Sequence, residues 1–351
     1  MTISPKALHG CLLGGAIGDA LGAPTEFLDL CSIRRKYGDS GLQTYDGLGK
    51  ITDDTQMALF TLEGMIRARL RWLERGIASV PDVLYHAYLR WLYTQEKYHK
   101  PDLPDYAYSG WLLDQRVLHE RRAPGMSCIS SLRMGRIGTM ENPINNSKGC
   151  GTIMRIAPVG LMFEEPFQTA CEISALTHGH PTGYLSAGFL AEVIYRLSIG
   201  NDLKEAIQKA ISILEGYEDH YETLWAVQKA LNLADGYVAF PEMLEQLGAG
   251  WIAEEALAIS LYCALKAKNF RDGVLLAVNH SGDSDSTGAI AGNILGLIHG
   301  ADGIPKEWID DHEVKDIIDE MVEDALVVLE LSSEEMDEDR RSLLLEKYPP
   351  N

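Results

Sequence analysis

Two glycine-rich stretches of this 351-residue chain decide its fold: residues 10–22 read GCLLGGAIGDALG, and residues 288–300 read GAIAGNILGLIHG. In each stretch a glycine recurs at every fourth position, so a helix of 3.6 residues per turn would carry a bare stripe along one face. Glycine costs about 1 kcal/mol relative to alanine at an interior helix position. The eight glycines therefore need a compensating interaction, and we predict that the two helices are buried and packed closely together. They are Gly10, Gly14, Gly18, Gly22, Gly288, Gly292, Gly296 and Gly300.

The rest of the chain also has helical periodicity, with apolar residues recurring at spacings of three and four. Alternating strand patterns are rare and short, which argues against a doubly wound sheet. We predict an all-α fold, with one compact helical domain over residues 1–331 and an acidic, solvated tail over residues 332–351. The predicted helices cover Thr55–Arg71, Val83–Thr94, Thr182–Ser198, Leu203–Glu215, Ala253–Lys268 and Val314–Leu331.

Charge and composition narrow the class of partner. A formal net charge of −20 argues against nucleic acid and against an anionic membrane surface, because both attract clustered lysine and arginine. The six cysteines are scattered without a CxxC pair, which predicts reduced thiols in a cytoplasmic protein. The apolar run near the N-terminus is broken by glycine and followed by Asp19, which disfavours a signal peptide. We expect a monomer.

Three acidic groups are candidates for chemistry: Glu26, the segment Thr52–Thr55, and the segment Gly282–Thr287. Helix capping is an alternative explanation for the two segments, since Asp, Ser and Thr are preferred N-cap residues. A cap needs one such residue, however, whereas both segments carry several. Adjacent carboxylates repel each other unless a cation lies between them, and oxygen donors suit Mg²⁺, Mn²⁺ or Ca²⁺ rather than zinc. An EF-hand is excluded, because Ile294 stands where its bidentate glutamate would be.

The segment Thr177-His178-Gly179-His180 offers two histidines separated by one residue. A metal pair is one interpretation of this spacing. Two histidines in a loop more often contact a substrate or the backbone, and we expect His180 to be a histidine with a structural partner.

Together these stretches resemble the ADP-ribosylglycohydrolase family. The matching segments follow the order of the family and span most of the chain: residues 14–22 with Glu26, Thr52–Thr55, Gly149–Pro158, Thr177-His178 and Gly282–Gly288. The resemblance implies a compact all-α fold that binds two divalent metal ions, Mg²⁺ or Mn²⁺. The ligands it implies are Thr52, Asp53, Asp54, Asp283, Asp285 and Ser286.

The same resemblance implies where a substrate binds. Glu26 would lie beside the distal ribose, and the ADP-ribose pocket would be lined by Ser147, Lys148, Gly149, Cys150, Gly151 and His178. The loop before Gly149 is less glycine-rich than in many relatives, and Lys148 within it would offer a charge to the diphosphate.

The resemblance implies a glycosidase that removes ADP-ribose from modified side chains, with Glu26, Asp54 and Asp283 as catalytic residues. Glu26 is the candidate acid/base, since it is the one isolated carboxylate near the site. Arginine-linked mono-ADP-ribose is the expected substrate. Serine-linked ADP-ribose and O-acetyl-ADP-ribose are alternatives, as is an immunity or antitoxin-type protein that occludes an ADP-ribosyltransferase. The expected partners are an ADP-ribosylated protein or small ADP-ribose conjugate, and a cognate ADP-ribosyltransferase.

Overall fold

The computed structural model describes residues 4–96, 105–236, 241–330 and 337–350, and these form seventeen α-helices. No strand is found among the described residues, and the prediction of an all-α fold is confirmed. The helices are α1 (Pro5–Gly22), α2 (Leu30–Tyr37), α3 (Asp53–Arg75), α4 (Val80–Gln95), α5 (Met126–Arg133), α6 (Ala157–Met162), α7 (Pro166–Ala175), α8 (Pro181–Ser198), α9 (Leu203–Leu214), α10 (Tyr221–Ala234), α11 (Pro241–Leu244), α12 (Ala253–Lys266), α13 (Phe270–Ala277), α14 (Ser284–His299), α15 (Lys306–Asp310), α16 (Lys315–Glu330) and α17 (Glu338–Lys347).

The six helices predicted from periodicity correspond to α3, α4, α8, α9, α12 and α16. Their ends lie within about four residues of the predicted ones, as is usual for helix boundaries; position 331 lies outside the described residues. Within the described part of the chain, no helix is both long enough and apolar enough to cross a membrane.

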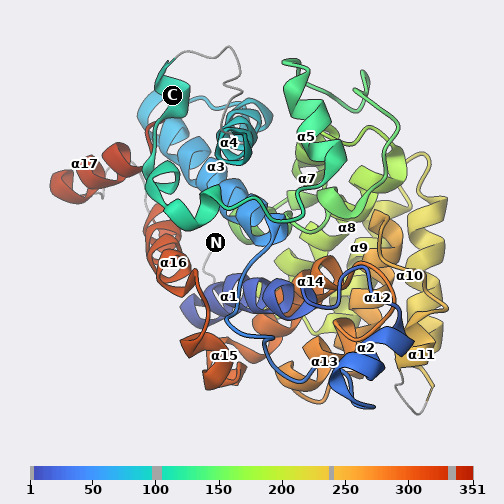
Figure 1. Cartoon of the computed structure of the whole chain (residues 1–351). Helices are drawn as coiled ribbons and strands as arrows, with labels where there is room; N and C mark the ends of the chain where they lie inside the picture. The colour runs from blue at the N-terminus through green and yellow to red at the C-terminus, as the bar shows by residue number, and fades with distance from the viewer. Residues whose placement is uncertain (1–3, 97–104, 237–240, 331–336, 351) are drawn as a thin grey trace.

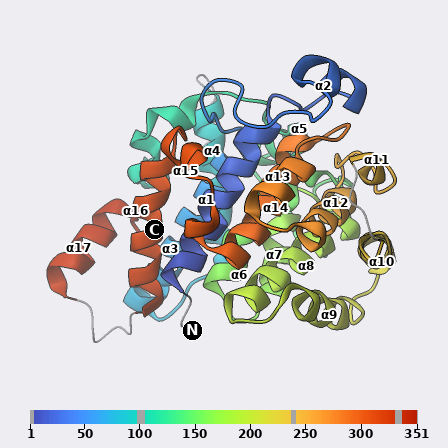
Figure 2. The same cartoon turned by 90° about the horizontal axis from the view of Figure 1, so that it is seen from below.

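The two glycine-striped helices, α1 and α14, run side by side through the middle of the molecule (Figures 1 and 2). They are antiparallel, because the glycines pair in reverse order as Gly10 with Gly296, Gly14 with Gly292, and Gly18 with Gly288. A Cβ atom built on Gly292 would lie 2.1 Å from the carbonyl oxygen of Gly14, and one built on Gly14 would lie 2.4 Å from that of Gly292. The backbones are therefore too close for any side chain, and the predicted packing is confirmed.

The end of the second stripe differs from the prediction. Helix α14 stops at His299, and Gly300 has φ +66°, a left-handed conformation that glycine adopts without steric cost. Gly300 therefore ends the helix instead of extending the stripe.

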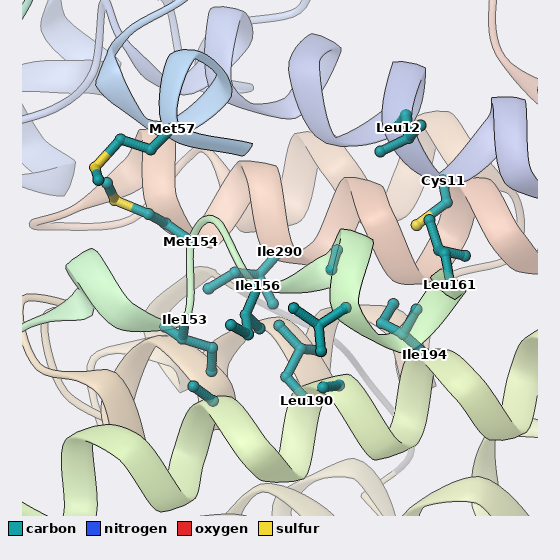
Figure 3. Packing of buried hydrophobic residues seen from close by; sticks show 14 of the residues in the cluster. Cys11, Leu12, Met57, Ile153, Met154, Ile156, Leu161, Leu190, Ile194 and Ile290 are labelled. Atoms are coloured by element: carbon teal, nitrogen blue, oxygen red, sulfur yellow. The ribbon is translucent and has the colours of Figure 1, made fainter. Parts of the chain in front are cut away.

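Apolar side chains from several helices fill the space beneath this pair. Figure 3 shows Met57 of α3 against Met154, and Ile290 of α14 facing the layer that contains Leu190 of α8. Each of these side chains is at most 4% exposed. The core thus ties α14 to α3 and α8, which fixes the end of α14 that bears the acidic residues.

The C-terminal segment agrees only in part with the predicted solvated tail: residues 337–340 are exposed, but the residues that follow contact the domain. Residues 337–350 include α17, and the side chains of Leu344 and Tyr348 are buried. The Tyr348 hydroxyl donates to Asp324 Oδ2 at 2.8 Å, and Arg67 donates to the carbonyl oxygen of Pro349 at 3.0 Å. These few apolar and hydrogen-bonded contacts outweigh the acidic composition. Residues 332–336 lie outside the described residues, and the domain boundary at 331/332 stays a prediction.

Candidate active site

Asp19 organises the start of helix α3. It is fully buried in α1, where burying a charge is costly unless the charge is hydrogen-bonded. Its carboxylate accepts hydrogen bonds from the backbone N–H and the hydroxyl of both Thr52 and Thr55. Asp19 thereby satisfies donors at the N-terminus of α3 and orients the segment that presents Asp53 and Asp54.

The next two residues face different partners. Asp53 Oδ2 accepts from the N–H of Gly125 at 2.9 Å, just before α5. Asp54 is buried, yet its Oδ1 has no hydrogen-bond partner among the described residues. Thr52 caps the helix, because its hydroxyl oxygen accepts from the N–H of Asp54 at 3.3 Å. Capping therefore explains Thr52 but neither aspartate.

The second acidic segment begins α14. Asp283 stands at the N-cap of the helix, but its side chain accepts no capping hydrogen bond. Its backbone N–H donates to Ala249 O at 2.8 Å, and its buried Oδ2 has no hydrogen-bond partner within the described ranges. Asp285 Oδ1 accepts from the N–H of Ser286 at 3.0 Å. The capping alternative thus fails for Asp283.

The structure brings the three acidic groups together. One carboxylate oxygen each from Glu26, Asp283 and Asp285 lie within 4.8 Å of one another. Burial and the charge of Asp285 raise the pKa of Asp54 and of Asp283 well above the usual range. Burial, together with the charges of Asp285 and Asp53, raises the pKa of Glu26 to about 9.

This chemistry fits a hard cation. The donors that converge are carboxylate and hydroxyl oxygens, the set that Mg²⁺, Mn²⁺ and Ca²⁺ prefer. Two buried oxygens, Asp54 Oδ1 and Asp283 Oδ2, have no hydrogen-bond partner in the described part of the chain that would compensate their burial. Several like charges share one desolvated volume, which is unfavourable without a positive charge among them. The arrangement is that of a candidate metal centre.

The metal-free protein should lose stability as pH rises through the neutral range. The pKa of Asp19 is raised from 3.8 to about 7 by burial and by the charge of Asp285, and that of Glu26 from 4.5 to about 9. A carboxyl group with a raised folded-state pKa contributes stability that is complete below its unfolded pKa and disappears through the folded one. We expect the melting temperature in EDTA to fall as the pH rises from about 4.5 to about 9, and excess MgCl₂ or MnCl₂ to restore most of the loss at the upper end of this range. Equal pH dependence with and without the metal in calorimetric scans would contradict this prediction.

The loop of residues 145–151 borders the acidic residues of the site. Asn145 holds it, since its Oδ1 accepts from the N–H groups of Ser147 at 2.9 Å and of Gly179 at 3.1 Å. The Ser147 hydroxyl hydrogen-bonds the Ser127 hydroxyl at 2.8 Å, and the N–H of Gly149 donates to Ser147 Oγ. The predicted pocket residues around Ser147–Gly151 therefore form one ordered turn.

Lys148 departs from its predicted role. Its ammonium group lies 2.6 Å from Glu222 Oε2 and also contacts the carboxylate of Glu254. These glutamates lie 74 and 106 residues further along the chain. They pair with the Lys148 ammonium group, which was expected to bind a diphosphate. The side chain of Lys148 links the loop to α10 and α12.

Cys150 and His178 serve the site in different ways. The Cys150 thiol lies beside Asp283, and burial together with the charges of Asp283 and Asp54 raises its pKa well above the usual range, so it stays protonated. His178 is buried behind the loop, with Nδ1 2.8 Å from the Thr177 hydroxyl. Burial and the nearby Arg155 lower the pKa of His178 to about 3, so it is neutral. It supports the loop rather than facing solvent.

Because Gly149 and Gly151 have no side chains, they leave room for the His178 ring. A Cβ atom built on either glycine would lie 3.3 Å from His178 Nε2, which is tighter than an ordinary contact. His180, by contrast, accepts from the N–H of Thr182 at 3.1 Å and caps α8. The prediction of a structural partner for His180 is confirmed.

Three residues that support the site were not predicted from the sequence. Asp19 and Asn145 are the hydrogen-bonding residues just described. Arg155 is fully buried, with its guanidinium 4.2 Å above the Tyr88 ring and 2.7 Å from the Thr177 hydroxyl. An aspartate inside a glycine-rich apolar helix was a signal that Asp19 must have buried partners. Asn145 and Arg155 carried no such local signal.

Comparison with known proteins identifies the family. Residues 4–336 match the ADP-ribosylglycohydrolase family. The chain is 26% identical over 327 residues to the ADP-ribosyl-[dinitrogen reductase] glycohydrolase of Rhodospirillum rubrum, covering 90% of this chain and 92% of that protein. It is 24% identical over 318 residues to the ADP-ribosylarginine hydrolase Tri1 of Pseudomonas putida (strain GB-1), covering 86% of this chain and 72% of that protein.

A solved structure described as an ADP-ribosylglycohydrolase-related protein complex shares the fold, with a TM-score of 0.63 and 24% identity over 93% of this chain and 97% of that one. The match to the family extends over almost the whole chain and includes every acidic residue of the site. The predicted resemblance and the predicted class of enzyme are therefore confirmed: the chain belongs to the ADP-ribosylglycohydrolase family.

Proposed function

We propose that this chain hydrolyses the N-glycosidic bond of arginine-linked mono-ADP-ribose on proteins, with two divalent ions, Mg²⁺ or Mn²⁺. The observation that carries the proposal is the convergence of six carboxylates from α1, α3, α14 and the loop after α1, two of whose buried oxygens have no hydrogen-bond partner among the described residues. The residues that would hold the ions are Thr52, Asp53, Asp54, Asp283, Asp285 and Ser286. A carboxylate oxygen of Glu26 lies within 4.8 Å of oxygens of Asp283 and Asp285, so Glu26 would lie beside the bound ions.

Different residues of the site would have different roles in hydrolysis. Cleavage at the anomeric carbon requires an oriented ribose, a water held for attack and stabilisation of an oxocarbenium-like transition state. When bound, the cations polarise ribose hydroxyls and acidify water. Asp54 and Asp283 hold this centre rigidly because both are buried. Glu26 keeps part of its surface exposed, so it is the carboxyl group best placed to exchange a proton with the departing side chain.

The preference for arginine rests on the relatives. The Pseudomonas putida protein, which is 24% identical to this chain, is named an ADP-ribosylarginine hydrolase. Occlusion of an ADP-ribosyltransferase is the weaker alternative, because blocking a partner does not require buried oxygens without hydrogen bonds. Six free cysteines support a cytoplasmic location.

The direct test is metal-dependent release of ADP-ribose from matched arginine-linked, serine-linked and O-acetyl substrates. We expect turnover of the arginine-linked substrate to be fastest, to stop in EDTA and to return on addition of MgCl₂ or MnCl₂. Faster turnover of the serine-linked or O-acetyl substrate would reject the arginine assignment. Full activity in EDTA would reject the metal centre.

A further inference from the structure

Two aromatic side chains lie exposed beside the acidic residues. Phe27 directly follows Glu26, and its ring stacks on that of Trp251, with centroids 5.1 Å apart and planes inclined by 24°. Phe27 is 71% exposed and Trp251 40% exposed. Phe27 therefore buries little of its apolar surface, and a contribution to the core does not explain its position.

The backbone holds Phe27 in an unfavourable conformation. Its φ is +65°, in the left-handed region that bulky residues rarely adopt. Hydrogen bonds fix the backbone on both sides of Phe27. Before it, the Thr25 hydroxyl donates to Val278 O at 2.8 Å, and after it, Leu28 O accepts from the N–H of Gly282 at 3.3 Å. A conformation of this kind persists only where the surroundings enforce it, and such residues cluster at ligand sites.

Trp251 is fixed to the same site from the other side. Its carbonyl oxygen accepts from the N–H of Cys150, in the loop of residues 145–151, at 3.1 Å. The preceding residue, Gly250, lies so near Asp283 that a Cβ atom built on it would be 3.3 Å from the Asp283 Cβ. The two rings thus join the segment that carries Glu26 to the segment that touches Asp283 and Cys150.

We propose that the Phe27–Trp251 pair binds the guanidinium group of the acceptor arginine and so determines specificity for the leaving group. This inference rests on the proposed function. A planar cation stacks favourably on aromatic faces, and the surrounding carboxylates add negative potential. Because the acidic centre binds the ribose that is cut, a group adjacent to Glu26 meets the departing side chain. The neutral adenine lies at the opposite end of ADP-ribose, beyond the diphosphate.

The test compares substrates that differ only in the leaving group. Phe27→Leu and Trp251→Leu should each lower kcat/KM for arginine-linked ADP-ribose by about 2- to 30-fold, the range of a cation–π contact from exposed to desolvated. The same variants should leave turnover of serine-linked or O-acetyl substrates within about 2-fold, since those leaving groups carry no planar cation. Phe27→Tyr keeps the ring and should retain activity. Trp72→Leu, at a tryptophan that is 50% exposed and remote from the site, is the matched control.

A binding measurement separates this inference from the proposed function. Agmatine, a small guanidinium compound, is titrated by NMR into the wild type with ADP-ribose and MgCl₂ present. We expect binding to the wild type and to Phe27→Tyr, and about 2- to 30-fold weaker binding to Phe27→Leu and Trp251→Leu. If agmatine binds the wild type but not these variants, the role of the Phe27–Trp251 pair in guanidinium binding is upheld. If the wild type does not hydrolyse arginine-linked substrates, only the proposed function is rejected. Equal agmatine affinity in all variants, or equal losses on every substrate, would overturn the inference, and unchanged melting temperatures exclude misfolding as the cause.

Discussion

Replacing Gly292 by leucine is expected to abolish cooperative folding of the whole domain. Even the Cβ atom of the new side chain would lie 2.1 Å from the Gly14 carbonyl oxygen, so α1 and α14 would have to separate along their length. Overpacking typically costs about 1–3 kcal/mol where neighbours can adjust. Here the obstacle is backbone, and domains have only about 5–15 kcal/mol of stability in total. Gly14→Leu should behave alike, because its Cβ would lie 2.4 Å from Gly292 O.

Calorimetry and near-UV circular dichroism of the purified variants test this result. Lys6→Leu is the matched control, since it places the same side chain on α1 at an exposed position. The control should melt near the wild type, whereas the two glycine variants should lack a sharp transition or accumulate as insoluble protein. Wild-type melting of both glycine variants would disprove close backbone packing as the basis of the fold.

The second large effect concerns activity. Asp283→Ala and Asp285→Ala are expected to reduce release of ADP-ribose by about a thousandfold or more. Metal ions supply several kcal/mol of transition-state stabilisation, and about 1.4 kcal/mol corresponds to tenfold in rate. The variants should still fold, because the Asp283 side chain makes no capping hydrogen bond. Removing this buried acid also relieves repulsion, since burial and the charge of Asp285 raise the pKa of Asp283 well above its usual range.

Loss of activity should coincide with loss of metal binding. Titration calorimetry with MnCl₂ should show weaker binding for both variants, and their melting temperatures in EDTA should equal or exceed that of the wild type. Asp316→Ala is the control, because that side chain is fully exposed at the start of α16. Undiminished turnover in Asp283→Ala and Asp285→Ala would refute the assignment of the site.

Much of the fold was predictable because the signals were local. Glycine at every fourth position has few explanations other than close helix packing, and periodicity located six further helices. The pairing register, Gly14 against Gly292, was not predictable, since each stripe repeats and several offsets look alike. The contacts of the C-terminal segment were not predictable either, because composition does not reveal that Tyr348 is buried and donates to Asp324.

The site was predictable where several oxygen donors stood together. The segments containing Asp53 and Asp283 carried more acids than helix capping needs, and the structure brings them together with Glu26. Single residues whose role depends on distant partners were not predictable. Lys148 was predicted to bind a phosphate, whereas in the structure its ammonium group pairs with Glu222 and Glu254.

The pairing of α1 with α14 has a consequence for biosynthesis. Helix α1 is translated long before its partner surface, which begins at Ser284 some 260 residues later in the chain. At about 5–20 residues per second, α1 waits roughly 13 to 50 s before it has anything to pack against. The same delay separates translation of Glu26 from that of Asp283 and Asp285. A nascent chain that ends before α14 therefore lacks both its central helix pair and two of its six acidic residues, so the site is complete only after α14 has been made.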